Sequence, residues 1–186
     1  MYEVELKIEL TAEEKIKLVE EFAQRGFGFE GVTPQRDYYV EAKDSEHGVG
    51  YDVVRYRQEG DVFIYTQKIW EMVDDFPVRR ENEHEISKEE FETEIAKLPD
   101  AIKIVKDREW YEGTYKDNAI SLTIDNVKFD HSPSMRYFIE AEISVADKNM
   151  VKETKDLIRE FVTELLDMPE GIIESPGMFS MALKKL

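Results

Sequence analysis

The sequence predicts an α+β fold: a closed, antiparallel, eight-stranded β-barrel with helices packed on its outside. Charged and apolar residues alternate in several short segments, and segments with helical spacing of apolar residues lie between them. Side chains on a strand alternate between two faces, so each such strand has one charged and one apolar face. If the charged faces meet around a closed barrel, the apolar faces point outward and require helices over them.

The first predicted strand, residues 2–10, shows this pattern over its whole length. Its two faces consist of two interleaved sets, Glu3, Glu5, Lys7 and Glu9 on one side and Val4, Leu6, Ile8 and Leu10 on the other. A single strand of this kind is also typical of a sheet edge with one solvated face. The same charge spacing recurs in later segments, however, and this recurrence favours the barrel.

The other elements follow in order along the chain. Strands are predicted over residues 35–40, 51–58, 62–68, 79–86, 102–111, 119–127 and 135–145. Helices are predicted over residues 12–25, 87–98 and 147–167, and a short helix after Pro176. Thr11 and Glu14 form a capping box at the first helix, and Ser87 with Glu90 forms a similar pattern at the second.

Length and composition restrict the class of protein. The 186 residues fit one domain, 1–186, with a substantial core. The chain has no cysteine, which excludes disulfides, thiolate metal sites and cysteine nucleophiles and indicates a cytoplasmic location. The net charge of −17 argues against a nucleic-acid partner, because binding by counterion release requires a basic surface.

Membrane association is not expected either. No apolar run approaches the roughly 18 residues of a membrane span, and the chain begins with a strand pattern, not with a signal peptide. The sequence does not distinguish a monomer from a homodimer.

A glycine-rich segment, Gly26 to Gly31, matches the spacing G-x-G-x-x-G of dinucleotide-binding loops. Here the segment follows a helix and precedes a strand, which is the reverse of the order that phosphate binding by this motif requires. We therefore interpret these glycines as a helix end and a turn.

Basic residues alternate on two neighbouring predicted strands. Arg55 and Arg57 share one face of their strand, and Lys68 lies on the strand that follows the Gly60-Asp61 turn. Arginine offers a planar fork of donors and lysine a point charge, so together they suit an oxyanion. An exposed basic patch is the alternative.

The segment from Arg79 to Ile86 has the most unusual composition. Alternate positions place one arginine and three carboxylates on a single face: Arg79, Glu81, Glu83 and Glu85. Carboxylates in a row repel one another unless cations lie between them, and hard cations such as Mg²⁺ or Mn²⁺ prefer oxygen ligands. Alternatively, these acids are surface charges that lead into the next helix.

Taken together, the motifs resemble the CYTH superfamily, also called triphosphate tunnel metalloenzymes, which includes class IV adenylyl cyclases and thiamine triphosphatases. The resemblance covers nearly the whole chain, in the order Glu3-x-Glu5-x-Lys7, Asp37-x-Tyr39, Arg55-x-Arg57, Thr66-x-Lys68, Arg79-x-Glu81-x-Glu83-x-Glu85, Lys106-x-Arg108, Asp125 and Phe138-Ile139-Glu140-Ala141-Glu142. Each motif alone is weak, but their joint order and spacing is specific.

The resemblance implies a triphosphate tunnel whose basic residues bind phosphate and whose acidic residues bind Mg²⁺ or Mn²⁺. The implied triphosphate ligands are Lys7, Arg55, Arg57, Lys68, Arg79, Lys106 and Arg108. The implied metal ligands are Glu3, Glu5, Glu81, Asp125, Glu140 and Glu142. Glu83 or Glu85 would orient the attacking water, and Lys7 also counts among the catalytic residues.

Two features depart from the family pattern. Arg136 occupies a position near the Glu140-x-Glu142 pair where the family usually has a small residue, often glycine. The terminal Met178-Phe179-Ser180 matches the closing serine-tyrosine of the family only loosely. These departures leave open the shape of the tunnel mouth and whether Lys184 or Lys185 reaches the ligand.

Three functions remain after this comparison. The first is metal-dependent hydrolysis of inorganic triphosphate, a nucleoside triphosphate or thiamine triphosphate. The second is a class IV adenylyl cyclase, which needs an adenine pocket that the sequence does not reveal. The third is a protein that binds polyphosphate or nucleotide without turnover, and the acidic rows argue against it.

Overall fold

The computed structural model describes residues 2–44, 46, 51–73, 76–130, 132, 134–168 and 173–184. Within these residues the strands are β1 (Tyr2–Leu10), β2 (Gly28–Asp44), β3 (Tyr51–Glu59), β4 (Val62–Val73), β5 (Phe76–Glu85), β6 (Ile102–Tyr115), β7 (Asn118–Phe129) and β8 (Arg136–Val145). The helices are α1 (Ala12–Gln24), α2 (Lys88–Ala96), the 3₁₀-helix η1 (Lys148–Met150), α3 (Val151–Leu166) and α4 (Met178–Lys184). None of the helices in this part of the chain is both long and apolar enough to cross a lipid bilayer.

The eight strands form one antiparallel sheet in the order β1-β8-β7-β6-β2-β3-β4-β5. The predicted α+β class and the eight strands are confirmed. The predicted closure is wrong, because in the described residues this order is linear and ends at β1 and at β5. Closure depends on strand tilt and stagger, which an alternating pattern of charged residues does not encode.

The described residues fall into two compact units. The first unit comprises residues Met1–Thr33, Asp107–Val127 and Met135–Pro176, and the second comprises Pro34–Lys106, Lys128–Ser134 and Gly177–Leu186. Three strands, β2, β6 and β7, contribute residues to both units. The prediction of a single domain over 1–186 stays a prediction.

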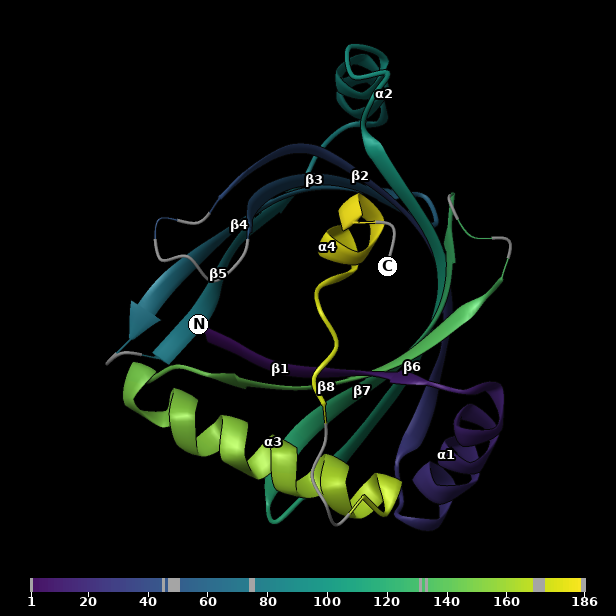
Figure 1. Ribbon diagram of the computed structural model, residues 1–186, viewed down its shortest axis with the longest axis vertical. Helices are drawn as coiled ribbons and strands as arrows, with labels where there is room; N and C mark the ends of the chain where they lie inside the picture. Colours follow the sequence, from purple (N-terminus) through teal and green to yellow (C-terminus); the bar gives the residue numbers. More distant parts are fainter. Residues whose placement is uncertain are drawn as a thin grey trace. The chain divides into compact units, whose positions relative to one another are not determined.

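In the first unit, helices cover the apolar face of the sheet, as predicted. Figure 1 shows α3 running along β1 and β8, and α1 contacts both α3 and β1. The apolar side chains of β1 are at most 5% exposed: Val4, Leu6, Ile8 and Leu10. From α3, Ile158 and Phe161 are equally buried, so burial of this apolar layer holds the unit together.

The outer edge of β1 is occupied by the segment that follows α3. Ser175 donates its backbone N–H to the Lys7 carbonyl at 2.8 Å, and its Oγ accepts the Glu9 N–H at 2.8 Å. Lys155 Nζ lies 2.5 Å from the carbonyl oxygen of Glu5. These contacts satisfy backbone groups with which a further strand would pair, and they explain why β1 is an end of the sheet.

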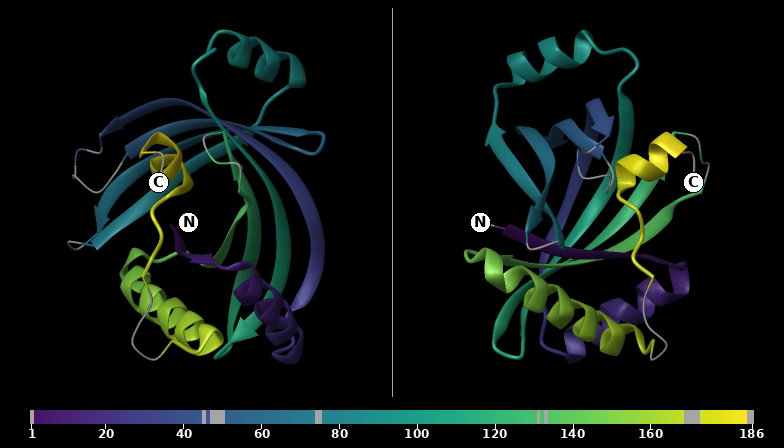
Figure 2. Two further views of the ribbon diagram at one scale, coloured as in Figure 1. Left: turned by 45° about the vertical axis from the view of Figure 1, so that its right-hand side comes forward. Right: turned by 60° about the vertical axis from the view of Figure 1, so that its left-hand side comes forward.

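In the second unit, the charged face of the sheet is the more deeply buried one. Asp37, Arg55, Arg57 and Thr66 are each at most 8% exposed. The opposite face carries aromatic side chains and is covered by one residue of α2, Phe91, whose ring centroid lies 4.9 to 6.4 Å from those of Phe63, Tyr38 and Tyr56. Figure 2 shows α2 at the end of this unit.

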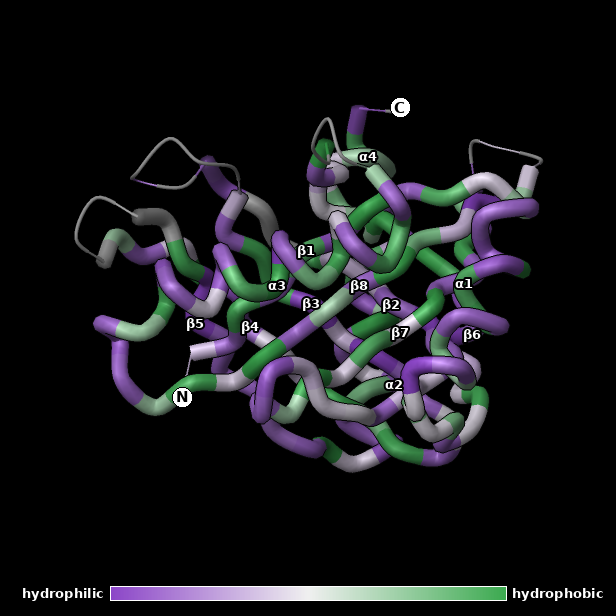
Figure 3. The backbone as a smooth tube through the Cα atoms, turned by 90° about the horizontal axis from the view of Figure 1, so that it is seen from below, coloured by the Kyte–Doolittle hydropathy of each residue, from purple (hydrophilic) through white to green (hydrophobic). Residues whose placement is uncertain are grey.

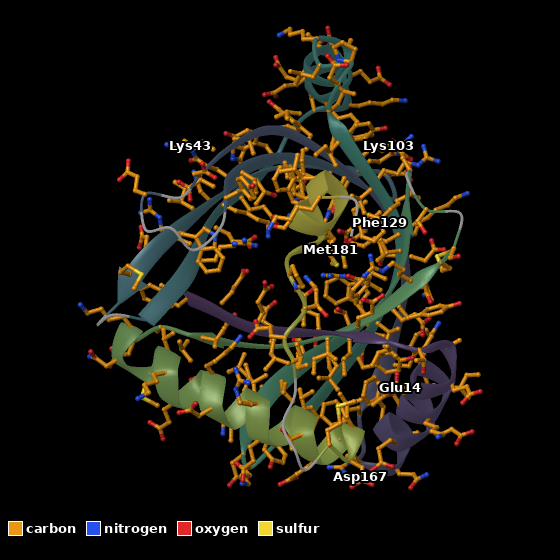
Figure 4. The ribbon with its side chains drawn as sticks, viewed as in Figure 1. Glu14, Lys43, Lys103, Phe129, Asp167 and Met181 are labelled. Atoms are coloured by element: carbon orange, nitrogen blue, oxygen red, sulfur yellow. The ribbon has the colours of Figure 1, made fainter. Side chains whose placement is uncertain are left out.

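Helix α4 packs on the charged side of β2 and β3. The ring of Phe179 lies 5.2 Å from that of Tyr39 and 5.6 Å from that of Tyr51, between centroids. Tyr39 shares its strand face with Asp37 because the two residues are two positions apart. In Figure 4 the labelled Met181 marks α4 near these strands, and this residue is 1% exposed.

The local sequence explains most element boundaries. The capping box at α1 is present in full, and the Ser87 side chain accepts the Glu90 N–H at α2. Asp147 caps η1, and Asp167, in a left-handed conformation, ends α3. Figure 3 shows hydrophobic and hydrophilic positions alternating along the strands.

Candidate functional site

The second unit contains a buried group of charged side chains on β2 and β3. Arg57 donates from Nε to Asp37 Oδ1 at 2.6 Å and from Nη2 to Oδ2 at 2.9 Å, so the pair is bidentate. Their Cα atoms are direct partners across the two strands. The pleat therefore places both side chains on one face, and packing buries them there.

Arg55 lies beside this pair and connects it to β4 and β5. Its Nη1 is 3.9 Å from Asp37 Oδ2, and its Nη2 donates to Thr66 Oγ1 at 2.9 Å and to Glu83 Oε2 at 3.1 Å. Thr66 in turn donates to Glu83 Oε2 at 2.8 Å. The Nε atom of Arg55 is buried and has no hydrogen-bond partner among the described residues.

The second unit buries several charged side chains, and less buried carboxylates also contact them. Its deeply buried charged residues in the described part of the chain are Arg55, Arg57, Lys106 and Asp37. Arg55 also pairs with Glu83, and Arg57 Nη1 lies 3.9 Å from Glu59 Oε2. Burial by itself raises the pKa of Asp37, but the charges of Arg57 and Arg55 and the hydrogen bonds from Arg57 outweigh it and hold this pKa well below its usual range. Asp37 is therefore ionised.

Further along β4 and β5, cations and carboxylates alternate across the ladder. Lys68 is the direct partner of Glu81 and forms an ion pair with it. Burial raises the pKa of Glu81, but Lys68 and Arg55 outweigh this effect and the pKa is lowered. The guanidinium of Arg79 lies over the ring of Trp70, 4.6 Å from its centroid.

The two predicted catalytic glutamates of β5 lie on one face but differ in their surroundings. Glu83 is held by Arg55 and Thr66 through Oε2 while 45% of its side chain stays exposed. Glu85 is exposed and lies opposite Ile64 on β4. Glu83 is thus the better positioned of the two.

The first unit contains a second charged network, on β1, β6, β7 and β8. Arg108 makes a bidentate pair with Asp125, with both distances 2.7 Å, and also donates to Glu140 Oε2 at 3.0 Å. Lys7 Nζ lies 3.0 Å from the same oxygen of Glu140. Burial by itself lowers the pKa of Lys7, but the negative charges of Glu140, Glu5 and Asp125 together raise this pKa by more than burial lowers it. The net shift is upward, so Lys7 is charged.

Carboxylates line β1 and β8 next to this network. Glu5 is the direct cross-strand partner of Glu142, and Glu3 lies two positions before Glu5 on the same face. Lys7 lies two positions after Glu5 on the same face, and its charge acts on Glu5. Carboxylate oxygens are the ligands that Mg²⁺ and Mn²⁺ prefer.

The rest of the predicted metal set is engaged differently. Asp125, Glu140 and Glu81 each form ion pairs with basic side chains. Accordingly, no group of three or more acidic or histidine side chains in metal-binding geometry occurs in the described ranges. Glu3, Glu5 and Glu142 offer carboxylate oxygens of the kind that divalent ions prefer, whereas Asp125, Glu140 and Glu81 would have to exchange a basic partner for metal.

Within each unit, the structure brings most of the predicted residues together. Sequence reasoning assigned no role to Asp37, Thr66 and Trp70. Thr66 and Trp70 each lie two positions from the assigned Lys68 on one strand, and this alternation was the available signal. Asp37 has no assigned residue on its own strand, and the strand register places it opposite Arg57. Arg136, the departure from the family pattern, pairs with Glu9 through two contacts of 2.6 Å. Lys184 is exposed on α4, and Lys185 lies outside the described residues.

Comparison with known proteins agrees with this architecture. The family model of the CYTH domain matches residues 1–171. A comparison with curated protein sequences finds no match.

Three solved structures share the fold over nearly the full length of both chains. A protein from Pyrococcus horikoshii OT3 is 21% identical, with all of each chain covered and a TM-score of 0.68. A candidate adenylate cyclase from Vibrio parahaemolyticus is 13% identical, covers 99% of this chain and 98% of its own, and has a TM-score of 0.67. A candidate adenylyl cyclase from Hippeastrum is described as having a dominant triphosphatase activity. It is 13% identical, the match covers 100% of this chain and 96% of that protein, and the TM-score is 0.60.

Proposed function

Because this chain belongs to the CYTH domain family, we propose that it is a divalent-metal-dependent enzyme that hydrolyses a triphosphate substrate. The substrate class comprises inorganic triphosphate, nucleoside triphosphates and thiamine triphosphate. The triphosphatase activity of the Hippeastrum protein, which is similar in fold, supports hydrolysis as the reaction. We further propose that residues 1–186 act as one catalytic domain in the cytoplasm, in keeping with the lack of cysteine.

The buried cations of the second unit carry this proposal. In the described part of the chain, Arg55, Arg57 and Lys106 are buried near the buried carboxylate of Asp37. The further carboxylate partners of the two arginines, Glu83 and Glu59, are 45% and 25% exposed, so an anionic ligand would add to the compensation of these buried charges. A phosphate chain supplies several negative charges in a row, and its oxygens are acceptors for the buried Nε of Arg55.

We assign the other predicted phosphate ligands as additional contacts along the chain of phosphates. They are Lys7, Lys68, Arg79 and Arg108, and each now forms an ion pair or lies over a ring. Their carboxylate partners keep the cationic groups in place before substrate arrives. Preorganised charge of this kind is the main source of catalysis in phosphoryl transfer, because little covalent chemistry is left to the protein.

We propose Mg²⁺ or Mn²⁺ as the cofactor, with Glu5 and Glu142 as its first ligands and Glu3, Glu81, Asp125 and Glu140 as the wider set. A bound divalent ion neutralises phosphate oxygens and aligns the transferred group. Lys7 and Arg108 hold the carboxylate of Glu140 in place through its Oε2. Glu140 thus keeps its orientation before any ion binds.

Glu83 is our candidate for orienting the attacking water, and Glu85 is the alternative. Both hydrogen bonds that fix Glu83 reach Oε2, while its side chain is 45% exposed. A carboxylate that is fixed at one oxygen and open to solvent can accept a hydrogen bond from a water molecule. This hydrogen bond orients the water so that a lone pair of the water oxygen points toward phosphorus.

Product analysis with purified protein tests the proposal directly. The protein is incubated with Mg²⁺ or Mn²⁺ and with inorganic triphosphate, the common nucleoside triphosphates and thiamine triphosphate in turn. We expect orthophosphate release from at least one substrate, and no release when a chelator removes the metal. Release that persists in the chelator would contradict the metal requirement.

The same assay separates the two alternatives. Cyclic AMP and pyrophosphate from ATP would identify a class IV adenylyl cyclase, which uses the same phosphate contacts but directs the ribose hydroxyl at the α-phosphate. Tight binding without products would identify a protein that binds polyphosphate without turnover. If the protein forms no product from any of these triphosphates and binds none of them, the proposal as a whole is rejected.

A further inference from the structure

Thr66 on β4 lies between a cation and a carboxylate on the charged face of the second unit. It is completely buried, and its Cα is the direct cross-strand partner of Arg55 on β3 and of Glu83 on β5. Arg55 Nη2 donates to Thr66 Oγ1 at 2.9 Å, and Oγ1 donates to Glu83 Oε2 at 2.8 Å. Because the same Nη2 also donates to Oε2 at 3.1 Å, the three side chains form a closed ring of hydrogen bonds.

The direction of these hydrogen bonds follows from the three functional groups. A guanidinium only donates, a carboxylate only accepts, and a hydroxyl has a single hydrogen. Arg55 cannot accept the hydrogen of Thr66, so this hydrogen points to Glu83. Thr66 therefore has no hydrogen left to donate to a phosphate oxygen, and any contribution it makes to the reaction passes through Glu83 or Arg55.

The hydrogen bonds fix one oxygen of Glu83 and leave the other for water. Both donors reach Oε2, and in the described part of the chain no protein group donates to Oε1. The side chain of Glu83 is 45% exposed, so Oε1 is the oxygen that water can reach. Because the two donors come from different strands, they restrict rotation of the carboxylate, and Oε1 keeps a defined direction.

The neighbouring carboxylates of β5 lack this arrangement. Glu81 lies opposite Lys68, is engaged in an ion pair with it and is only 13% exposed. Glu85 lies opposite Ile64, whose side chain has no donor. Of the three carboxylates in this row, Glu83 is therefore the one that combines a fixed orientation with exposure to solvent.

We propose that Thr66 is a positioning residue for the attacking water. Its hydroxyl holds Glu83 so that Oε1 faces the water molecule, and it ties this carboxylate to Arg55, which contacts the phosphate chain in the proposed function. The inference rests on the proposed function and deepens it, because it assigns the water to Glu83, not to Glu85, and to one of its two oxygens. Such positioning is effective because a displacement of about 1 Å at a reacting group can lower the rate about 100-fold.

Steady-state kinetics and binding together test this role. The variants are Thr66→Val, which removes the hydroxyl at nearly constant shape, Thr66→Ser, which keeps it, and Thr154→Val, a control at a buried threonine of α3 in the first unit. Orthophosphate release is measured with Mg²⁺ and with whichever of inorganic triphosphate, ATP, GTP and thiamine triphosphate the wild type hydrolyses fastest. Affinity for the same compound is measured by calorimetric titration without divalent metal.

We expect Thr66→Val to lower kcat about 10- to 100-fold and to change the metal-free affinity less than about threefold, because Thr66 gives the phosphates no donor. Thr66→Ser and Thr154→Val should keep kcat within about threefold of the wild type. Thr66→Ala repeats the test if the valine variant does not fold. An unchanged kcat, or an affinity and a kcat/KM that fall by the same factor, overturns the inference. If the wild type releases no orthophosphate from any of these compounds, the proposed function fails and the inference fails with it.

A double-mutant cycle with Glu83→Gln separates positioning of Glu83 from a general effect on the fold. If Thr66 acts through Glu83, the effects of the two single variants are not additive, and Thr66→Val in the Glu83→Gln background lowers kcat by less than about a further threefold. An additive fall would mean that the hydroxyl acts elsewhere, and full turnover by Glu83→Gln would leave Thr66 nothing to position. Either result overturns the inference, while hydrolysis by the wild type still supports the proposed function.

Discussion

The two units bury charge in different ways. In the first unit, Lys7 and Arg108 contact Asp125 and Glu140, so two cations meet two carboxylates among groups at most 13% exposed. In the second unit, Arg55 and Arg57 share the buried carboxylate of Asp37, and their further carboxylate partners, Glu83 and Glu59, are 45% and 25% exposed. Both units place these groups on the charged faces of strands with apolar residues at alternate positions.

This difference separates a network whose carboxylates are all buried from one whose carboxylates are partly exposed to solvent. The buried carboxylates of the first unit compensate its cations at close range and hold the side chains in place. In the second unit, solvent screens part of the counter-charge that Glu83 and Glu59 provide. We therefore expect anion binding to stabilise the second unit and metal-dependent steps to depend on the first.

The largest expected effect is a loss of stability when the buried carboxylate of Asp37 in the second unit is removed. Asp37→Asn leaves Arg57 and Arg55 without their buried counter-charge and should lower the free energy of unfolding by about 3–5 kcal/mol. Denaturant titration measures this change, with the exposed Asp61→Asn as the control. In Asp125→Asn, Lys7 and Arg108 still pair with the carboxylate of Glu140. The loss of unfolding free energy in this variant should therefore be smaller than in Asp37→Asn. The reverse order of the two losses would break the comparison.

The second prediction, with a somewhat smaller expected effect on the free energy of unfolding, concerns the stabilisation of the protein by bound inorganic triphosphate. Inorganic triphosphate at about 100 times its dissociation constant should raise the free energy of unfolding by about 2.7 kcal/mol. Arg55→Met removes a buried donor from the cationic cluster and should reduce this gain to below about 1 kcal/mol at the same concentration. Arg136→Met, an arginine of the first unit outside the proposed site, is the matched control and should keep the gain. Equal gains in both variants would show that the cluster does not bind the anion.

The third prediction concerns the metal-dependent role of Glu140, the carboxylate that Lys7 and Arg108 share in the first unit. Glu140→Gln removes the negative charge that Lys7 and Arg108 hold in place, and metal-dependent turnover should fall at least about 10-fold, or about 1.4 kcal/mol. Circular dichroism should show a folded protein, because Asp125 still pairs with Arg108. Glu9→Gln, on the same face of β1, serves as the control. Full activity in Glu140→Gln would remove this residue from the proposed metal set.

Alternation predicted the strands well because it depends only on local geometry. The period of two places side chains on faces irrespective of which strands pair, so the charged row of β1 and its buried apolar row were both correctly predicted. The first part of β2, from Gly28 to Pro34, was missed because glycine and proline are uncommon in strands. Closure failed as a prediction because the edge of β1 is taken by Ser175, which lies far away in the sequence.

The site shows the same division between local and long-range information. The sequence indicated which side chains share a face, but not which carboxylate each cation selects. Arg108 pairs with Asp125 and Glu140, 17 and 32 positions away, and the strand register decides both pairs.

The smallest expected effect concerns acid and sharpens the role of Asp37. Its pKa is lowered in the folded protein, so its contribution to stability is present above the ordinary pKa and is lost as the pH falls toward the folded value. At pH 3.5 the ordinary pKa of about 3.9 implies a loss of about 0.7 kcal/mol from this one group. The difference in unfolding free energy between wild type and Asp37→Asn should therefore shrink by about that amount from pH 7 to pH 3.5. A constant difference over this interval would mean that Asp37 has its ordinary pKa in the folded protein. In that case Arg57 and Arg55 would not stabilise its ionised form.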